Sequence, residues 1–96
     1  MKKLKDWFQE KKITEVECII PDLTGIARGK IMPADKFLRY EGLRMPEAVF
    51  LQSVTGEWIP YENLFDVDPA EIDMQLRPDP STTCVVPWVE EPTAQV

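Results

Sequence analysis

Histidine is absent from this sequence. Histidine is the base of Ser-His-Asp and Cys-His catalytic sites and the commonest protein ligand of metal ions. Its absence excludes both kinds of catalytic site from the chain's own residues. Any chemistry that the chain serves must therefore use carboxylates, lysine, backbone groups or a partner.

Cysteine is scarce, and no long apolar run is present. Cys18 and Cys84 each lie in an apolar stretch; a disulfide between them stays open, but we favour two buried free thiols in a reducing cytosol. No run approaches the ~20 apolar residues of a membrane span. The lysines near Met1 are not followed by the apolar segment of a signal peptide. We therefore expect a cytoplasmic location and no membrane partner.

Basic residues are almost absent from the second half. Residues 1–44 hold ten Lys/Arg and seven acids, net +3, whereas residues 45–96 hold one Arg and ten acids, net −9, which gives −6 in total. This balance argues against a nucleic-acid partner, because no basic stripe covers a row of phosphates. We favour a solvated acidic face, with a basic partner or cationic substrates as the alternative.

Ninety-six residues, of which 44% are hydrophobic and 29% charged, predict one small globular domain. Leu4, Trp7 and Phe8 recur at helical spacing, and the stretch after them alternates as a strand does. The elements expected in the first half are a helix (3–12), a strand (15–20), a turn (22–25), a returning strand (26–32) and a short helix (33–40).

The second half predicts shorter elements around a long ordered loop. Its expected parts are an apolar run (47–51), the loop (52–69), a half-buried strand (72–77), a turn (78–82), a β-rich run (83–89) and a tail (92–96) that reads as a strand cut off early. We therefore expect a piece of a longer protein. The order of elements predicts an α+β fold, a β-grasp-like mixed sheet with one or two short helices.

Three segments carry a resemblance to a known family: DLTGIARGK at 22–30, DMQLRPD at 73–79 and VPW at 86–88. Together they resemble the amino-terminal domain of the glutamine synthetase family. The Arg-Gly-Lys version is most similar to the γ-glutamyl-polyamine synthetase branch. The resemblance divides the chain into an amino-terminal helix (1–12) and a β-grasp domain (13–96) whose last strand is truncated.

The resemblance implies a larger catalytic domain that this chain lacks. In the family, that domain holds ATP, Mg²⁺ or Mn²⁺, and glutamate; the γ-carboxylate is phosphorylated, and ammonia or an amine displaces the phosphate. No catalytic or metal-binding residue is therefore assigned here, and no cofactor or activity is expected of the 96 residues alone. The full-length protein is expected to form a homo-oligomer, a dodecamer of two hexameric rings.

Residues 50–60 match the family loop that closes the active site of a neighbouring subunit. The family reads FDGSSIGGW where this chain reads FLQSVTGEW over 50–58, so Leu51 stands in place of an aspartate. In the family that aspartate binds ammonium and takes its proton, which leucine cannot do. Leucine can pack against the methylenes of a longer amine, at about 0.8 kcal/mol for each buried CH₂. We therefore predict a glutamate–amine ligase.

Four further loop residues are candidates for substrate contact in trans. Trp58 either caps the neighbour's site or pins the loop to its own domain. Glu57 either meets a cationic amine or is simply an exposed acid, which we favour. Gln52 and Ser53 either bind substrate or cap the loop's backbone, and we favour capping.

Other charged and aromatic residues have simpler interpretations. Arg28 and Lys30 share one strand face, for which we favour solvation over a sheet edge or subunit contact. Trp7 and Trp88 are expected to pack in the core or an interface. Four clustered acids lack the glycine turn and terminal glutamate of a calcium loop, so no metal site is expected at Asp66, Asp68, Glu71 and Asp73.

Three alternatives remain open. The parent is a true glutamine synthetase that uses ammonia, or the chain is a free-standing β-grasp module that binds a protein partner through a sheet edge. The third is a family member that lost catalysis and acts as a regulator.

Overall fold

The computed structural model describes residues 1–50, 55, 57 and 73–96 of the chain. Short helices and strands alternate along these ranges. In chain order they are α1 (Lys2–Glu10), β1 (Glu15–Pro21), β2 (Ala27–Pro33), α2 (Ala34–Tyr40), β3 (Leu43–Pro46), the 3₁₀ helix η1 (Glu47–Phe50), β4 (Asp73–Leu76), the 3₁₀ helix η3 (Pro80–Thr82), β5 (Cys84–Val85) and β6 (Thr93–Gln95).

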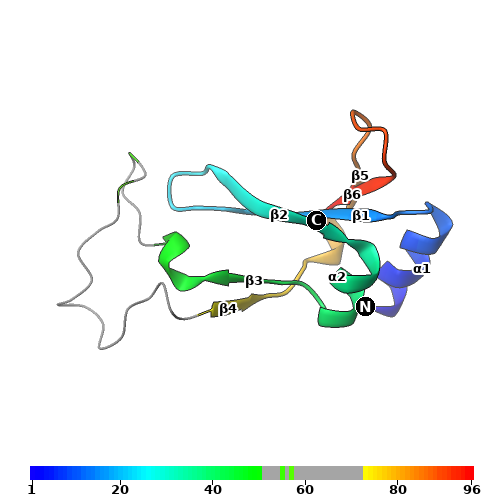
Figure 1. The fold of residues 1–96 in the computed structure, drawn as a ribbon, viewed down its shortest axis with the longest axis horizontal. Coiled ribbons are helices and arrows are strands. Elements are labelled where there is room, and N and C mark those ends of the chain that lie inside the picture. The colour runs from blue at the N-terminus through cyan, green and yellow to red at the C-terminus, as the bar shows by residue number, and fades with distance from the viewer. Residues whose placement is uncertain (51–54, 56, 58–72) are drawn as a thin grey trace.

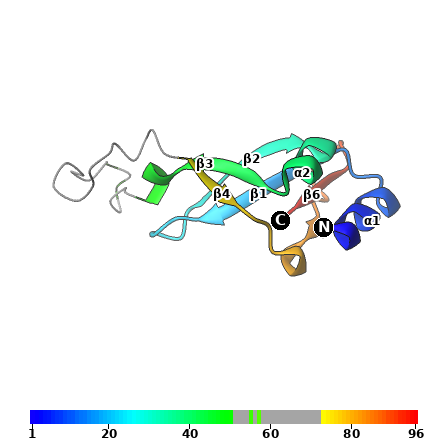
Figure 2. The same ribbon diagram turned by 90° about the horizontal axis from the view of Figure 1, so that it is seen from below.

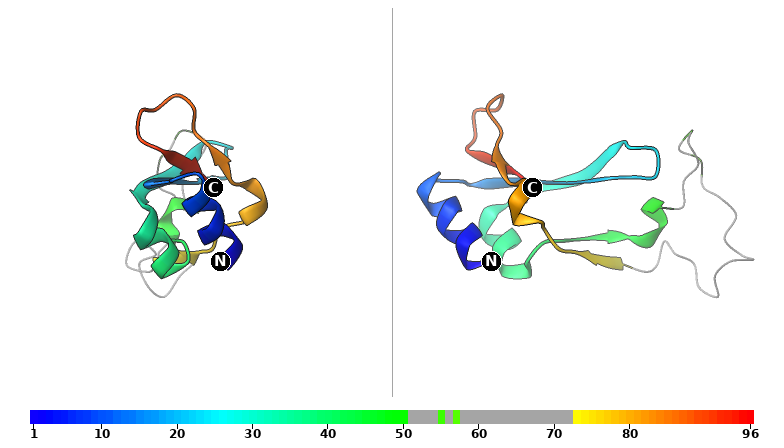
Figure 3. Two further views of the ribbon diagram at one scale, coloured as in Figure 1. Left: turned by 90° about the vertical axis from the view of Figure 1, so that its right-hand side faces the viewer. Right: turned by 180° about the vertical axis from the view of Figure 1, so that it is seen from behind.

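A four-stranded mixed sheet is the centre of the fold. Its strand order is β2-β1-β6-β5, in which β1 pairs antiparallel with β2 and parallel with β6. The two helices and a separate antiparallel pair, β3–β4, lie on one side of this sheet (Figures 1 and 3). The predicted α+β, β-grasp-like fold with two short helices is confirmed.

Helix α1 forms because its apolar residues share one face. Leu4 and Phe8 are buried on that face, and Trp7 packs half-buried beside them. After the helix, Lys12 takes a left-handed conformation with φ 55°, and the amide of Ile13 donates to the carbonyl of Phe8 at 2.9 Å. The predicted helix is confirmed, and it ends two residues before the predicted boundary.

The β1–β2 hairpin follows from alternation and from a turn built on Asp22. Val16 and Cys18 point into the core from β1. The Asp22 carboxylate accepts hydrogen bonds from the Thr24 hydroxyl at 2.7 Å and from the Thr24 amide at 2.9 Å. Gly25 takes φ +82°, which a side chain would disfavour. The predicted hairpin and turn are confirmed.

Helix α2 contributes a deeply buried side chain to the core and ends at a tight turn. Phe37 is 1% exposed, the most deeply buried aromatic side chain of the described residues. Glu41 takes φ 54°, and the amide of Gly42 donates to the Phe37 carbonyl at 3.2 Å. Gly42 itself has φ +133°, and a Cβ at this position would overlap the Leu76 carbonyl oxygen. The backbone thus turns from α2 into β3 where only glycine fits.

The core lies between the inner face of the sheet and the elements that cover it. Figure 2 shows α2 and the β3–β4 pair lying across the β1–β2 hairpin. Buried side chains come from both helices, from three strands and from the connection between α1 and β1, namely Leu4, Phe8, Ile13, Val16, Cys18, Ala34, Phe37, Leu43, Met45 and Ala94. Burial of these side chains stabilises the arrangement at about 25 cal/mol per Å² of apolar surface.

The prediction of a β-rich run over residues 83–89 is wrong for most of those residues. The strand is confined to Cys84–Val85, and Pro87 then ends the ladder because it has no amide hydrogen to donate. Val86 is buried, but Trp88 is 72% exposed, so its expected packing in the chain's own core is wrong, and packing in an interface stays a prediction. Residues beyond the strand form a loop that projects away from the helices (Figure 1).

The two cysteines are free, as predicted, but only Cys18 is buried. Cys84 is exposed because β5 is the edge strand of the sheet and its residues are open to solvent. The expectation of two buried thiols is therefore wrong for Cys84.

Strands β3, β4 and β6 can each be compared with the sequence prediction. Strand β3 was not predicted at all, and it pairs with β4 through Leu43–Leu76 and Met45–Met74. The predicted alternation of β4 is confirmed over residues 73–76, where every second side chain is half-buried. The tail does form a strand, β6, and its register places Val16 beside Ala94.

The expected loop 52–69 lies outside the described residues, except for positions 55 and 57.

Candidate functional site

The predicted substrate loop, 50–60, is described only in part. Phe50 ends η1 and is half-buried, and Glu57 is exposed. Four of the five candidate residues, Leu51, Gln52, Ser53 and Trp58, lie outside the described residues. Their roles stay predictions.

The β3–β4 pair holds the two ends of the segment that contains this loop. Pro46 pairs with Asp73, so the chain leaves and returns to the fold at neighbouring positions (Figure 1). Met45 is buried and anchors the β3–β4 pair in the core. Ala48, in the 3₁₀ helix η1 that follows β3, is buried as well. The described residues on either side of positions 51–72 therefore belong to a packed platform, the β3–β4 pair with η1.

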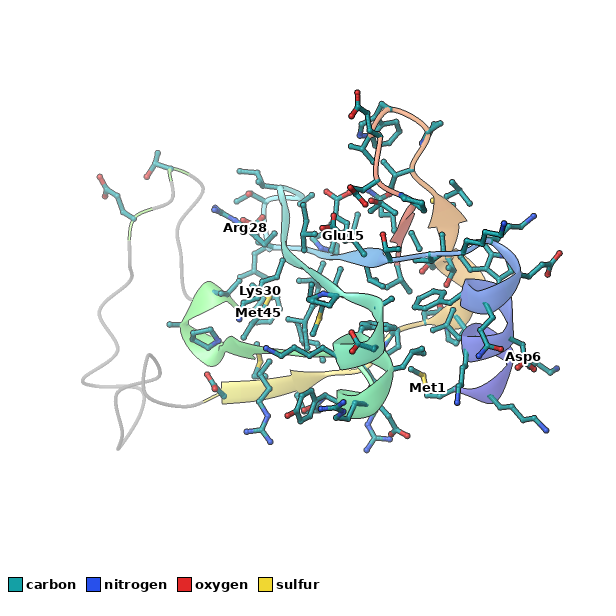
Figure 4. The ribbon with its side chains drawn as sticks, turned by 45° about the vertical axis from the view of Figure 1, so that its right-hand side comes forward. Met1, Asp6, Glu15, Arg28, Lys30 and Met45 are labelled. Atoms are coloured by element: carbon teal, nitrogen blue, oxygen red, sulfur yellow. The ribbon has the colours of Figure 1, made fainter. Side chains whose placement is uncertain are left out.

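Two cations of the segment 22–30, which carries part of the family resemblance, have polar partners within the chain. The Arg28 guanidinium lies 3.1 Å from a carboxylate oxygen of Asp22, and the Lys30 ammonium donates to the Arg44 carbonyl at 2.9 Å. Figure 4 shows Arg28 and Lys30 on β2, with Lys30 reaching toward Met45 on β3. Both cations stay at the surface, yet each has a polar partner within the chain.

Hydrogen bonds keep Asp22 ionised. The Thr24 hydroxyl contributes most, followed by the amides of Thr24 and Ile26 and by Arg28, and together they hold the pKa of the Asp22 carboxyl well below its usual range. The hydrogen bonds of this carboxylate within the described residues all go to the turn and to the start of β2.

Asp79 forms a second carboxylate turn. It accepts from the Ser81 hydroxyl at 2.6 Å and the Ser81 amide at 3.0 Å, which lowers the pKa of its carboxyl and caps η3. A cavity of about 240 Å³ lies beside it, lined largely by apolar residues between the sheet and β4. Nothing in this arrangement activates a nucleophile or a base.

Metal ligands do not gather in the described ranges 1–50 and 73–96. No group of three Asp, Glu or Cys side chains there is placed to hold an ion. Of the four clustered acids, Asp73 is exposed at the start of β4, and Asp66, Asp68 and Glu71 lie outside the described residues.

No helix in the described part of the chain is long and apolar enough to cross a lipid bilayer.

A groove of about 850 Å³ between β2, α2 and the β3–β4 pair was missed by sequence analysis. We call it the basic groove. Its lining holds four exposed cations and one acid, namely Lys30, Lys36, Arg39, Arg44 and Glu41. These cations do not stand next to one another in the sequence. The one sequence feature that pointed toward the basic groove was the excess of Lys/Arg in residues 1–44.

The fold therefore defines a small α+β, β-grasp-like domain. No protein-family model matches the chain, and no curated protein matches its sequence.

Proposed function

We propose that the chain is the non-catalytic amino-terminal domain of an ATP-dependent glutamate–amine ligase. In this proposal, residues 50–60 close the active site of a neighbouring subunit. The observation that carries it is the β3–β4 platform, which holds both ends of the segment containing the loop. The β-grasp-like fold agrees with the domain that the sequence resemblance implies.

The loop's task follows from the chemistry of the reaction. ATP with Mg²⁺ or Mn²⁺, held by the catalytic domain, supplies an activated γ-carboxylate that an amine can attack. Leu51 would contact the methylenes of the incoming amine, and Glu57, exposed in this chain, would face its positive charge. Trp58, Gln52 and Ser53 would close the pocket and exclude water, which otherwise competes for the activated carboxylate.

The proposal also names the partners and the location. The partners are the chain's own catalytic domain and neighbouring copies, in a homo-oligomer that we take to be a dodecamer. Small-molecule glutamate and an amine are the substrates. The compartment is the cytoplasm, in keeping with two free cysteines.

Steady-state kinetics of the full-length protein test this function. The specificity constant kcat/KM is measured for ammonium and for a short aliphatic diamine, with glutamate and Mg-ATP saturating. We expect the diamine to give the higher value. A higher value for ammonium would support a true glutamine synthetase instead, and no ATP turnover with either would support a regulator.

A substitution at Leu51 sharpens the test. Leu51→Asp restores the carboxylate that the family uses for ammonium, so the ratio of kcat/KM for ammonium over diamine should rise by about tenfold or more. Leu51→Asn, which has nearly the same shape and no charge, is the matched control. If both variants change the ratio equally, the side chain at this position does not select the amine by its charge.

A further inference from the structure

The cations of the basic groove have no acidic partners among the described residues. Lys30 and Arg44 make hydrogen bonds to neutral groups, the Arg44 carbonyl and the Gln75 amide oxygen. In the ranges that the structure describes, the one ion pair joins Asp22 to Arg28, outside the groove. Glu41 is the single acid in the lining, so the groove carries a net positive charge of +3 from four cations and one carboxylate.

The groove runs along the free edge of the main sheet. Strand β2 is at one end of the strand order, and among the described strands it pairs with β1 alone. Four consecutive residues of β2, Lys30 to Pro33, line the groove. Successive side chains of a strand point to opposite faces, so residues of both faces of β2 contribute to this lining. As an edge strand, β2 has backbone groups that no other described strand pairs with, and the groove lies beside residues 30–33 of that strand.

Apolar side chains lie between the cations. Ile31 is 65% exposed and Tyr40 is 58% exposed, and both contribute to the lining together with the half-buried Met32. Apolar side chains that gather in one hollow and are rimmed by polar residues are typical of surfaces that contact other proteins. The groove thus combines an open strand edge, positive charge and apolar contact area.

We propose that the basic groove binds an extended, carboxylate-rich polypeptide segment, which adds to β2 as a further strand. Backbone hydrogen bonds to the edge would supply affinity, and pairing of its Asp or Glu side chains with Lys36, Arg39 and Arg44 would supply specificity. This partner surface is separate from loop 50–60, and the inference does not depend on the proposed ligase function.

The features of the groove favour a polypeptide over a phosphate-bearing ligand. A phosphate needs several donors that converge on one point, whereas these cations come from β2, α2 and β3 and alternate with apolar residues. A nucleic acid would gain little from the strand edge, because its backbone offers no amide hydrogen to pair with it. An extended peptide uses all three features at once.

Calorimetry and backbone-amide NMR of the 96-residue protein test the proposal. The probe is a synthetic peptide of about eight residues in which glutamate alternates with valine, a length that spans one strand. The control peptide carries glutamine in place of glutamate. We expect the acidic peptide to bind at least about tenfold more tightly at low salt and to shift the amide signals of β2 and α2.

Charge-reversal variants connect binding to the groove. Lys36→Glu combined with Arg39→Glu should weaken the acidic peptide by about tenfold or more. Lys3→Glu combined with Lys11→Glu makes the same change in net charge on or beside α1, away from the groove, and should leave affinity within about twofold. Equal weakening by both variants, or a failure of the acidic peptide to bind the wild-type protein, would overturn the proposal. NMR shifts of the wild-type protein decide the location even if a variant fails to fold.

Two further probes separate the proposed contact from its rivals. A peptide N-methylated at every internal residue keeps its carboxylates but has no amide hydrogen to donate at either edge, so it should bind at least about tenfold more weakly. Undiminished binding would overturn strand addition. Inorganic polyphosphate or a single-stranded oligonucleotide that binds the same residues more tightly than the acidic peptide would overturn the polypeptide partner.

Discussion

The guanidinium of Arg28 lies 3.1 Å from the carboxylate of Asp22, and this pair ties the second strand of the hairpin to its own turn. The same carboxylate accepts from the hydroxyl and amide of Thr24 and from the amide of Ile26. One side chain therefore organises the turn and the start of β2.

The pKa of Asp22 predicts how stability depends on pH. Because its pKa is lowered in the folded state, Asp22 stabilises the fold fully above the unfolded value of about 4, and this contribution is lost as the pH falls through the lower folded value. Urea unfolding of the wild type should therefore lose more stability than Asp22→Asn between pH about 4 and about 2. Thr24→Val removes the largest cause of the lowered pKa, so its loss of stability should be smaller and should end at a higher pH. Parallel pH profiles for all three proteins would contradict the prediction.

Two glycines give a matched test of backbone geometry. Gly25 and Gly42 both have positive φ, but space beside Gly25 is open, whereas a Cβ at Gly42 would overlap the Leu76 carbonyl oxygen. Gly25→Ala should cost about 1 kcal/mol of unfolding free energy, from the conformation alone. Gly42→Ala should cost about 2–4 kcal/mol, because the turn into β3 must also shift. Chemical denaturation monitored by tryptophan fluorescence measures both, and equal losses would count against the close approach at Gly42.

The two thiols should differ sharply in reactivity. Burial raises the pKa of Cys18 to about 11, so little thiolate is present at neutral pH, whereas Cys84 is exposed on the edge strand β5. A thiol reagent should modify one cysteine quickly and the second only on unfolding. Cys84→Ser should remove the fast phase, and Cys18→Ala should keep it. Two fast phases in the native wild type would show that the core around Cys18 is open.

Local patterns in the sequence were sufficient for the elements that depend on neighbours in the chain. Helix α1, the hairpin and its turn follow from the spacing of Leu4 and Phe8 and from the chemistry of Asp22 and Gly25, all within a few residues. Strand β3 was missed because it is four residues long, ends in a proline, and depends on a partner strand about thirty residues away.

Exposure was harder to predict than secondary structure. Cys84 and Trp88 lie in a run that looks uniformly apolar, yet the edge position of β5 and the break at Pro87 leave both in solvent. The basic groove was also beyond local reasoning, because Lys30, Arg39 and Arg44 meet only after β2, α2 and β3 have packed. For the loop residues Leu51, Gln52, Ser53 and Trp58, the amino-acid pattern remains the basis of the prediction.

The parallel pairing of β1 with β6 has a consequence for how the molecule is made. Glu15 lies beside Thr93, so the middle of the sheet joins residues 78 positions apart in the chain. On the ribosome, the hairpin emerges early and must wait, its apolar side uncovered, until the ninety-third residue has left the exit tunnel. Closure of such a distant contact carries a large entropic cost and slows folding. The nascent chain should therefore be most vulnerable to aggregation and to proteases in the interval between the emergence of the hairpin and that of residue 93.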